Sequence, residues 1–216
     1  MHRNHRLRRQ QARRLLSGTG AALAMLVVGA SSAVAWESDF YETGSYIGVS
    51  GIGLFTNFGS EIGESGSRPI TGITSAGDSG GFRLSAGTHI TPWIALQMDF
   101  QYVAPVKLRS STPPGSHEFA IFTGSATFKG YPLAKILEST LEGRLQPFVK
   151  VSPSISGLTG APIKTPIAFT IAVGGGTEYW ITDTVTLNIE GAYWWGTASL
   201  NHLEYGTLAL GVAYHF

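Results

Sequence analysis

The sequence contains no cysteine and few charged residues. Without cysteine among its 216 residues, the chain cannot form disulfides, a thiolate metal site or a cysteine nucleophile. Charged residues make up 13% of the chain, against about 25% in a soluble domain. Beyond residue 35, no apolar run approaches the ~20 residues of a membrane-spanning helix. The 28 glycines and a mean hydropathy of +0.11 favour strands that are apolar on one face, although a soluble β-sandwich also fits this composition.

The basic residues are unevenly distributed. Six arginines precede Leu15, and all 14 acidic residues follow Trp36. Removing residues 1–35 leaves nine basic and 14 acidic residues, a net charge of −5. Because nucleic-acid affinity depends on positive charge, we expect no nucleic-acid partner.

Residues 1–35 have the order of a secretory signal peptide. A basic segment, residues 1–14, is followed by an apolar segment, residues 15–32, and by Ala33-Val34-Ala35. A membrane anchor is the weaker alternative, because glycine, serine and threonine dilute the apolar segment. Arg13-Arg14 resembles a weak twin-arginine signal. We discount it, because the strand pattern described next predicts a β-barrel, and such a barrel must be exported unfolded. We therefore predict cleavage after Ala35 and a mature domain of residues 36–216.

The mature chain alternates between apolar and small or polar residues, with a period of two. The candidate strands are residues 45–55, 81–90, 94–102, 118–131, 145–156, 167–179, 185–195 and 205–216. Each is close to the ~9–11 residues with which a tilted strand crosses a bilayer. This pattern predicts an all-β fold, an eight-stranded antiparallel up-and-down transmembrane β-barrel.

The connections between these strands differ at the two ends. Long segments rich in glycine, serine, proline and threonine are predicted at 56–80, 103–117, 157–166 and 196–204, and short turns at 91–93 and 181–184. Residues 132–144 are the exception, since their leucines and isoleucine have helical spacing and predict a short amphipathic helix or a single helical turn. Long loops of outer-membrane barrels face the exterior of the cell.

Charged residues within the strands fall on the face opposite the apolar one. They are Arg83, Asp99, Lys129, Lys150, Glu178 and Glu190. Because a lysine or arginine facing lipid costs about 2–4 kcal/mol near the midplane, we expect all six inside the barrel. Arg83 is predicted to pair with Asp99, and Lys150 with Glu178 or Glu190. Paired charges would plug the lumen, which disfavours a general diffusion porin. A narrow or gated channel stays an alternative.

Aromatic residues gather where the strands should meet the membrane interfaces. We expect one girdle at the short turns and another at the long loops. The first comprises Trp93, Tyr131, Phe148, Tyr179, Trp180 and Phe216, and the second Phe55, Tyr102, Phe119, Trp194, Trp195 and Tyr205.

Several segments resemble the outer membrane protein β-barrel domain family, which includes the transmembrane barrel of outer membrane protein A. They are residues 45–49 (SYIGV), 143–149 (GRLQPFV), 174–179 (GGGTEY) with 181–183 (ITD), and 210–216 (LGVAYHF). The resemblance implies an integral barrel of the bacterial outer membrane. It also implies that Leu208, Leu210, Val212, Tyr214 and Phe216 form the signal read by the barrel assembly machinery. No peptidoglycan-binding domain is expected, because the chain stops at the final strand.

Some barrels of this class modify lipid A, using a His-x-Ser pair on one strand. No histidine here has a serine two positions later; the nearest substitute is Ser116-His117-Glu118 with His202 and Glu204. We therefore predict no enzyme activity and no catalytic, cofactor or metal site. The leading hypothesis is an envelope-integrity role with surface-exposed loops, and the alternatives are a lipid A-modifying enzyme or a narrow solute channel. Expected partners are outer-membrane lipid, lipopolysaccharide, the assembly machinery and periplasmic chaperones. The sequence does not determine the oligomeric state.

Overall fold

The computed structural model describes residues 44–56, 61–62, 70–112, 114–133, 143–160, 167–197, 200 and 203–216. All of them belong to one compact unit, Ala35–Phe216. Their strands are β1 Ser45–Thr56, β2 Glu61–Ile62, β3 Ile70–Ala76, β4 Ser79–Thr91, β5 Ile94–Thr112, β6 Pro114–Gly130, β7 Leu145–Thr159, β8 Ile167–Thr182, β9 Val185–Gly196 and β10 Glu204–His215. The predicted leader lies outside the described residues.

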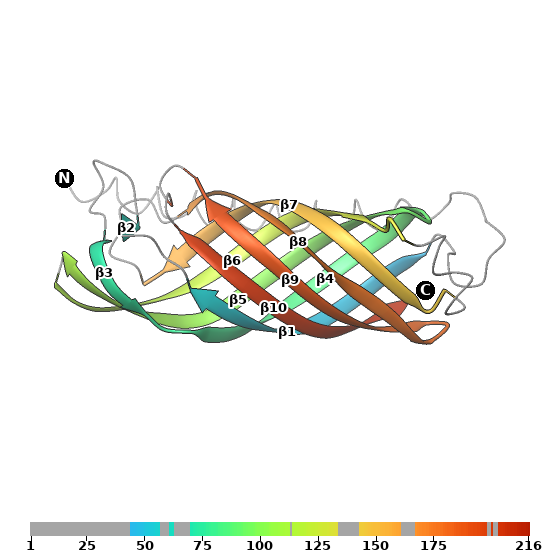
Figure 1. Ribbon diagram of the computed structural model, residues 1–216, viewed down its shortest axis with the longest axis horizontal. Coiled ribbons are helices and arrows are strands. Elements are labelled where there is room, and N and C mark those ends of the chain that lie inside the picture. Colours follow the sequence, from blue (N-terminus) through green and yellow to red (C-terminus); the bar gives the residue numbers. More distant parts are fainter. Residues whose placement is uncertain are drawn as a thin grey trace, which may run out of the picture. The chain divides into compact units, whose positions relative to one another are not determined.

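Eight of these strands close into an antiparallel barrel. Around the ring the order is β1-β4-β5-β6-β7-β8-β9-β10, and β10 pairs with β1 from Tyr46↔His215 to Thr56↔Tyr205. Figure 1 shows these strands running obliquely to the long axis of the barrel. Closure pairs the backbone around the ring and leaves no open sheet edge there. The predicted eight-stranded up-and-down barrel is confirmed.

The two ends of the barrel differ as the sequence predicts. The end that we call the turn end contains the turns between β4 and β5 and between β8 and β9, as well as Phe216, whose N–H donates to the Ser45 carbonyl at 3.0 Å. At the opposite end, the loop end, β2 and β3 lie within the predicted loop 56–80. The predicted helix within 132–144 lies largely outside the described residues.

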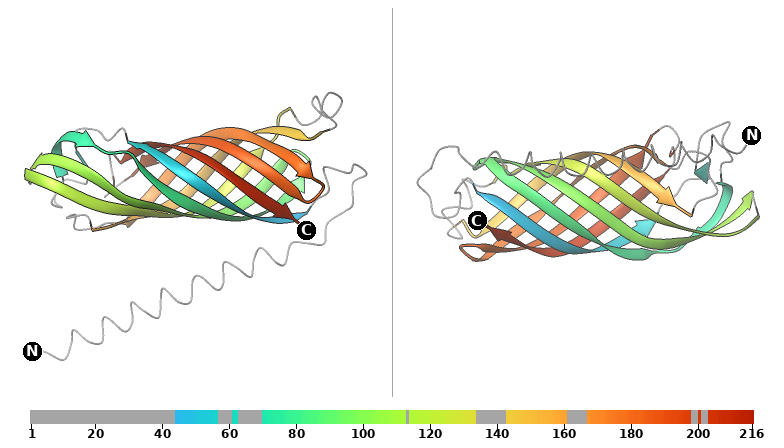
Figure 2. Two further views of the ribbon diagram at one scale, coloured as in Figure 1. Left: turned by 90° about the horizontal axis from the view of Figure 1, so that it is seen from below. Right: turned by 180° about the vertical axis from the view of Figure 1, so that it is seen from behind.

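The prediction of a loop at 103–117 is wrong, because β5 and β6 continue through it as a long hairpin. β3 pairs with β5 there, and the hairpin projects past the other strands at the loop end (Figures 1 and 2). A β-bulge between Val103 and Val106 shifts the register, so the inward positions change from odd to even. Pro105 and the change from odd to even inward positions interrupt the period-two pattern, so the sequence does not reveal this part of the strand.

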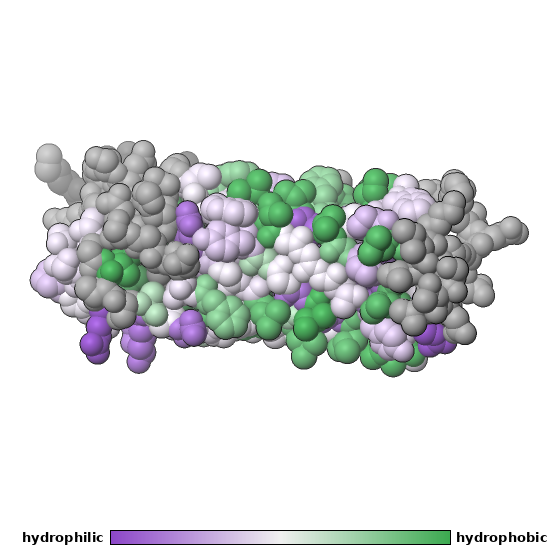
Figure 3. Space-filling model, in the orientation of Figure 1, coloured by the Kyte–Doolittle hydropathy of each residue, from purple (hydrophilic) through white to green (hydrophobic). Residues whose placement is uncertain are grey.

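Outward positions are apolar along the strands. On β10 the outward side chains are Leu208, Leu210, Val212, Tyr214 and Phe216, each 44–69% exposed, whereas Ala209 and Ala213 point inward and are buried. Hydrophobic side chains gather over the middle of the barrel on the face shown in Figure 3, and hydrophilic ones lie toward its ends. This sorting is expected for a sheet with lipid on one side.

Candidate functional site in the barrel lumen

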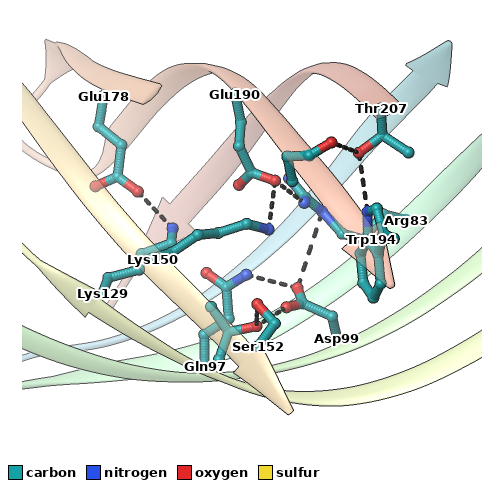
Figure 4. A network of polar contacts seen from close by, with 12 residues as sticks. Arg83, Gln97, Asp99, Lys129, Lys150, Ser152, Glu178, Glu190, Trp194 and Thr207 are labelled. Atoms are coloured by element: carbon teal, nitrogen blue, oxygen red, sulfur yellow. Dashed lines mark hydrogen bonds and ion pairs between the residues drawn. The ribbon is translucent and has the colours of Figure 1, made fainter. Parts of the chain in front are cut away.

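The structure places all six predicted charged residues inside the barrel. Each has at most 6% of its surface exposed, and together they supply three positive and three negative charges. They project from β4, β5, β6, β7, β8 and β9. The charges therefore sum to zero, and these side chains point toward one another inside the barrel (Figure 4).

Glu190 is the centre of the larger ion-pair group. Its Oε1 accepts a hydrogen bond from Lys150 Nζ at 2.6 Å and one from Arg83 Nη1. Arg83 Nε also lies 3.9 Å from Asp99 Oδ1. The predicted contact between Arg83 and Asp99 is therefore present, but Arg83 contacts Glu190 more closely.

Asp99 is satisfied mainly by neutral donors. Gln97 Nε2 donates to its Oδ1 at 2.5 Å, and Thr127 Oγ1 donates to its Oδ2 at 2.7 Å. Tyr46 in turn donates its hydroxyl proton to Gln97 Oε1 at 2.7 Å. Since Thr127 also contacts Ser152 at 2.8 Å, these bonds join side chains of β1, β5, β6 and β7 in one polar layer.

A second ion pair lies nearer the turn end. Lys129 Nζ donates to Glu178 Oε1 at 2.7 Å, and the Tyr131 hydroxyl donates to Glu178 Oε2 at 3.0 Å. The Lys129 ammonium also lies 4.6 Å from the centre of the Phe148 ring, within the range of a cation–π contact. Sequence reasoning did not predict the Lys129–Glu178 pair, because neighbouring strands alone do not bring these residues together.

Glycines on β8 make room for large lumen side chains on β7. Lys150 is paired with Gly174, and Phe148 with Gly176. A Cβ added at Gly176 would collide with the Ile189 carbonyl and touch the Phe148 ring at 3.0 Å. The GGG segment of β8 therefore lets the backbones of β8 and β9 approach each other closely beside the buried ion pairs.

Between the ion pairs and the turn end, a set of rings lies inside the barrel, and we call it the turn-end cluster. It consists of Tyr46, His89, Tyr131, Phe148, Trp180 and His215. The His215 ring lies 4.3 Å from the Trp180 ring and 5.1 Å from the Tyr46 ring, centre to centre. His89 lies 5.5 Å from Tyr131 and 6.1 Å from His215.

Between the ion pairs and the loop end, a large apolar cluster lies inside the barrel, beside a few buried hydroxyl groups such as those of Thr123, Ser156 and Thr170. The buried loop-end cluster includes Leu54, Val103, Val106, Leu108, Phe119, Ile121, Leu158, Trp194, Leu200, Leu203 and Tyr205. Leu200 and Leu203 come from the β9–β10 connection, which is tied to the barrel by Gly196 N donating to the Leu203 carbonyl at 2.9 Å. The predicted inward charges therefore do not extend to this end, and the sequence analysis did not predict its apolar cluster.

The two predicted aromatic girdles are only partly correct. Trp93, Tyr179, Phe216, Phe55 and Trp195 point outward and are exposed. Six of the others point inward and are buried: Tyr131, Phe148, Trp180, Phe119, Trp194 and Tyr205. They belong to the turn-end and loop-end clusters, because each occupies an inward position in the barrel wall.

The structure separates the residues considered for catalysis. Glu118 forms an ion pair with Lys107 at 3.5 Å on the exposed face of the hairpin, while His117 Nε2 lies 3.1 Å from Ser110 Oγ on the other face. Glu204 accepts a hydrogen bond from the Tyr193 hydroxyl at 2.8 Å, and His202 lies outside the described residues. Within the described residues, no group of three histidine or carboxylate side chains could hold a metal ion.

The described part of the chain contains no helix that is both long and apolar enough to cross a membrane.

Comparison with known proteins gives a family and a fold. The family model of the outer membrane protein beta-barrel domain matches residues 20–216. The barrel is similar to the outer membrane protein OprG of Pseudomonas aeruginosa, with a TM-score of 0.61, 10% identity and coverage of 83% of this chain and 99% of that one. For Neisserial surface protein A these values are 0.58, 14%, 80% and 97%, and for the outer membrane protein AlkL they are 0.52, 17%, 86% and 96%. No curated protein sequence matches the chain.

Proposed function

The chain belongs to the outer membrane protein beta-barrel domain family, and on that premise we propose that it is an integral outer-membrane barrel with a closed lumen, which supports the envelope and displays its loop end outside the cell. The family is one of the bacterial outer membrane. In this orientation the turn end faces the periplasm, and the projecting β5–β6 hairpin faces the exterior.

Three successive groups of buried side chains inside the barrel support the proposal of a closed lumen. Glu190, held by both Arg83 and Lys150, occupies the middle of the barrel. Rings close one end of this layer, and the loop-end cluster closes the other. An eight-stranded barrel has just enough interior for side chains, so these three layers leave no route for solutes.

Single-channel recording from the refolded protein in a planar bilayer tests the closed lumen. We expect no conductance at about pH 7, where the charges of the middle layer stay paired and the two end clusters stay packed. A reconstituted porin serves as the positive control, and altered migration of unboiled samples on a gel shows that the protein is folded. A steady conductance at this pH would establish the narrow solute channel instead.

Export and assembly make a second part of the proposal. We infer cleavage after Ala35, insertion by the barrel assembly machinery and contact with lipopolysaccharide at the loop end. The outward residues of β10 support the assembly step, because Leu208, Leu210, Val212, Tyr214 and Phe216 are exposed on one face. Intact-mass measurement of the membrane-purified protein tests the cleavage; a mass that includes residues 1–35 would contradict it.

One contact supports lipid modification as a second candidate function. Ser110 Oγ and His117 Nε2 lie 3.1 Å apart, the arrangement of a nucleophile and its base. The lipid A mass spectrum of cells that express the protein would show loss of an acyl chain if this pair hydrolyses esters. The change should disappear with Ser110→Ala and persist with Ser116→Ala, the matched control on the other face of the hairpin. An unchanged spectrum would exclude this activity on lipid A.

A further inference from the structure

The turn-end cluster contains two histidines in a seal to which all eight barrel strands contribute. β1, β4, β7, β8 and β10 supply its rings, Tyr131 follows β6, and Ala95 of β5 and Thr186 of β9 pack beside them. We propose that His89 and His215 make this cluster a proton-sensitive seal, closed while both imidazoles are neutral and opened to water from the turn end when one is protonated. The inference rests on the proposed closed lumen.

Few ionisable groups surround the two imidazoles, and only one of them is a carboxylate that could balance a positive charge. The ionisable groups that face them are Tyr46 on β1, Lys129 and Tyr131 from β6, and Glu178 on β8. Asp99 on β5 lies behind Gln97, and β7 and β9 contribute Phe148 and Thr186, which do not ionise in this range. His215 Nε2 contacts Thr186 Oγ1 at 3.1 Å.

A proton on either histidine would add a positive charge to the turn-end cluster, which already borders the Lys129 ammonium. Lys129 Nζ lies 5.6 Å from the Tyr46 ring, which itself lies 5.7 Å from His89 and 5.1 Å from His215. Glu178, the nearest carboxylate, already accepts hydrogen bonds from Lys129 and Tyr131. A charged imidazolium without a counter-ion of its own is costly where water is excluded. Separation of the rings and entry of water would relieve this cost.

Histidine is the side chain whose charge ordinarily changes between about pH 5 and pH 8. The other facing groups, a lysine, tyrosines and a paired carboxylate, keep their charge over that interval. A response to mild acid that depends on His89 and His215 therefore separates this seal from general acid denaturation.

The absence of cysteine allows a direct test with single thiols. Ala95 is fully buried and pairs with His89 across β4 and β5, so Ala95→Cys reports access to the seal. Thr184→Cys, in the exposed β8–β9 turn, is the control for the reagent and for thiol ionisation. The measurement is the rate of modification by a small pyridyl disulfide, which stays reactive in acid. It is expressed as the ratio of the rate in the Ala95→Cys variant to the rate in the Thr184→Cys variant.

We expect this ratio to rise about tenfold or more between about pH 7 and pH 5. When H89Q/H215Q is added to both thiol variants, the ratio should stay constant, and with His215→Gln alone the rise should be smaller. Only variants that migrate as folded barrels are compared. A constant ratio with both histidines present, or an equal rise in the glutamine variants, would overturn the seal. Conductance at about pH 7 would instead overturn the closed lumen itself, so the two failures are distinguishable.

Discussion

Replacing Glu190 with glutamine is expected to destabilise the folded barrel by about 3–5 kcal/mol, the usual cost of removing one partner from a buried ion pair. Glu190 is 3% exposed and is the carboxylate that both Arg83 and Lys150 contact. At the 2.6 Å between Lys150 Nζ and Glu190 Oε1, an effective dielectric constant of about 20 gives a direct attraction of roughly 6 kcal/mol. The amide can still accept hydrogen bonds, so the expected loss is smaller than this attraction.

A double-mutant cycle isolates the charge from the change in shape. Lys150→Met removes one cation, and K150M/E190Q restores a lumen with equal numbers of positive and negative charges. We expect the double variant to be more stable than Glu190→Gln alone, with a coupling free energy of about 2–3 kcal/mol, because the two residues belong to one network. Urea titrations in lipid vesicles give the free energies of unfolding, with each folded fraction read from migration of unboiled samples.

Two results would contradict this reasoning. If Glu190→Gln unfolds at the same urea concentration as the parent protein, water must already screen the lumen charges, and the filled lumen is incorrect. If the single losses simply add in the double variant, Lys150 and Glu190 do not interact. Glu178→Gln is the matched comparison, since Glu178 contacts a single cation, Lys129, and its loss should cost less.

Three further changes probe the wall of the barrel. Gly176→Ala should destabilise the barrel by about 1–3 kcal/mol through the clash with the Ile189 carbonyl, whereas Gly124→Ala, with open space around it, should have little effect in the same urea titration. Leu210→Arg puts a charge on an outward position and should cost about 2–4 kcal/mol in vesicles; an unchanged midpoint would mean that this face does not meet lipid. Phe216→Ala should lower the heat-modifiable fraction in cell membranes while leaving refolding of the purified chain unchanged.

The strand pattern and the inward charges could be predicted because both depend on alternation along one strand. An inward Arg83 follows from the outward Leu84 and Phe82 beside it, with no knowledge of the partner strand. Pairing between charges could be predicted only in part: Arg83 contacts Asp99, and of the two partners predicted for Lys150 the structure contains Glu190. Lys129 and Glu178 lie on β6 and β8, with β7 between them, and meet because their side chains cross the lumen.

The aromatic residues show why the two girdles were predicted only in part. Trp194 and Trp195 are adjacent in the sequence, yet Trp194 is buried in the lumen and Trp195 faces outward. Position near a strand end favours a girdle, but the parity of the position decides which way the ring points. Applying parity to each aromatic residue would have assigned Trp194 and Tyr205 to the lumen, where their rings stack at 5.7 Å.

The β-bulge at residues 103–106 explains why the apolar interior at the loop end was not predicted. Before the bulge Gln97, Asp99 and Gln101 face inward at odd positions, and after it Val106 and Leu108 face inward at even ones. Without that shift, Lys107 and Arg109 would point into the lumen and the valine and leucine would point out. The extra residue therefore lets one strand contribute to the polar layer in the middle of the barrel and to the apolar cluster at its loop end. A sequence pattern with a single phase can describe either half, but not both.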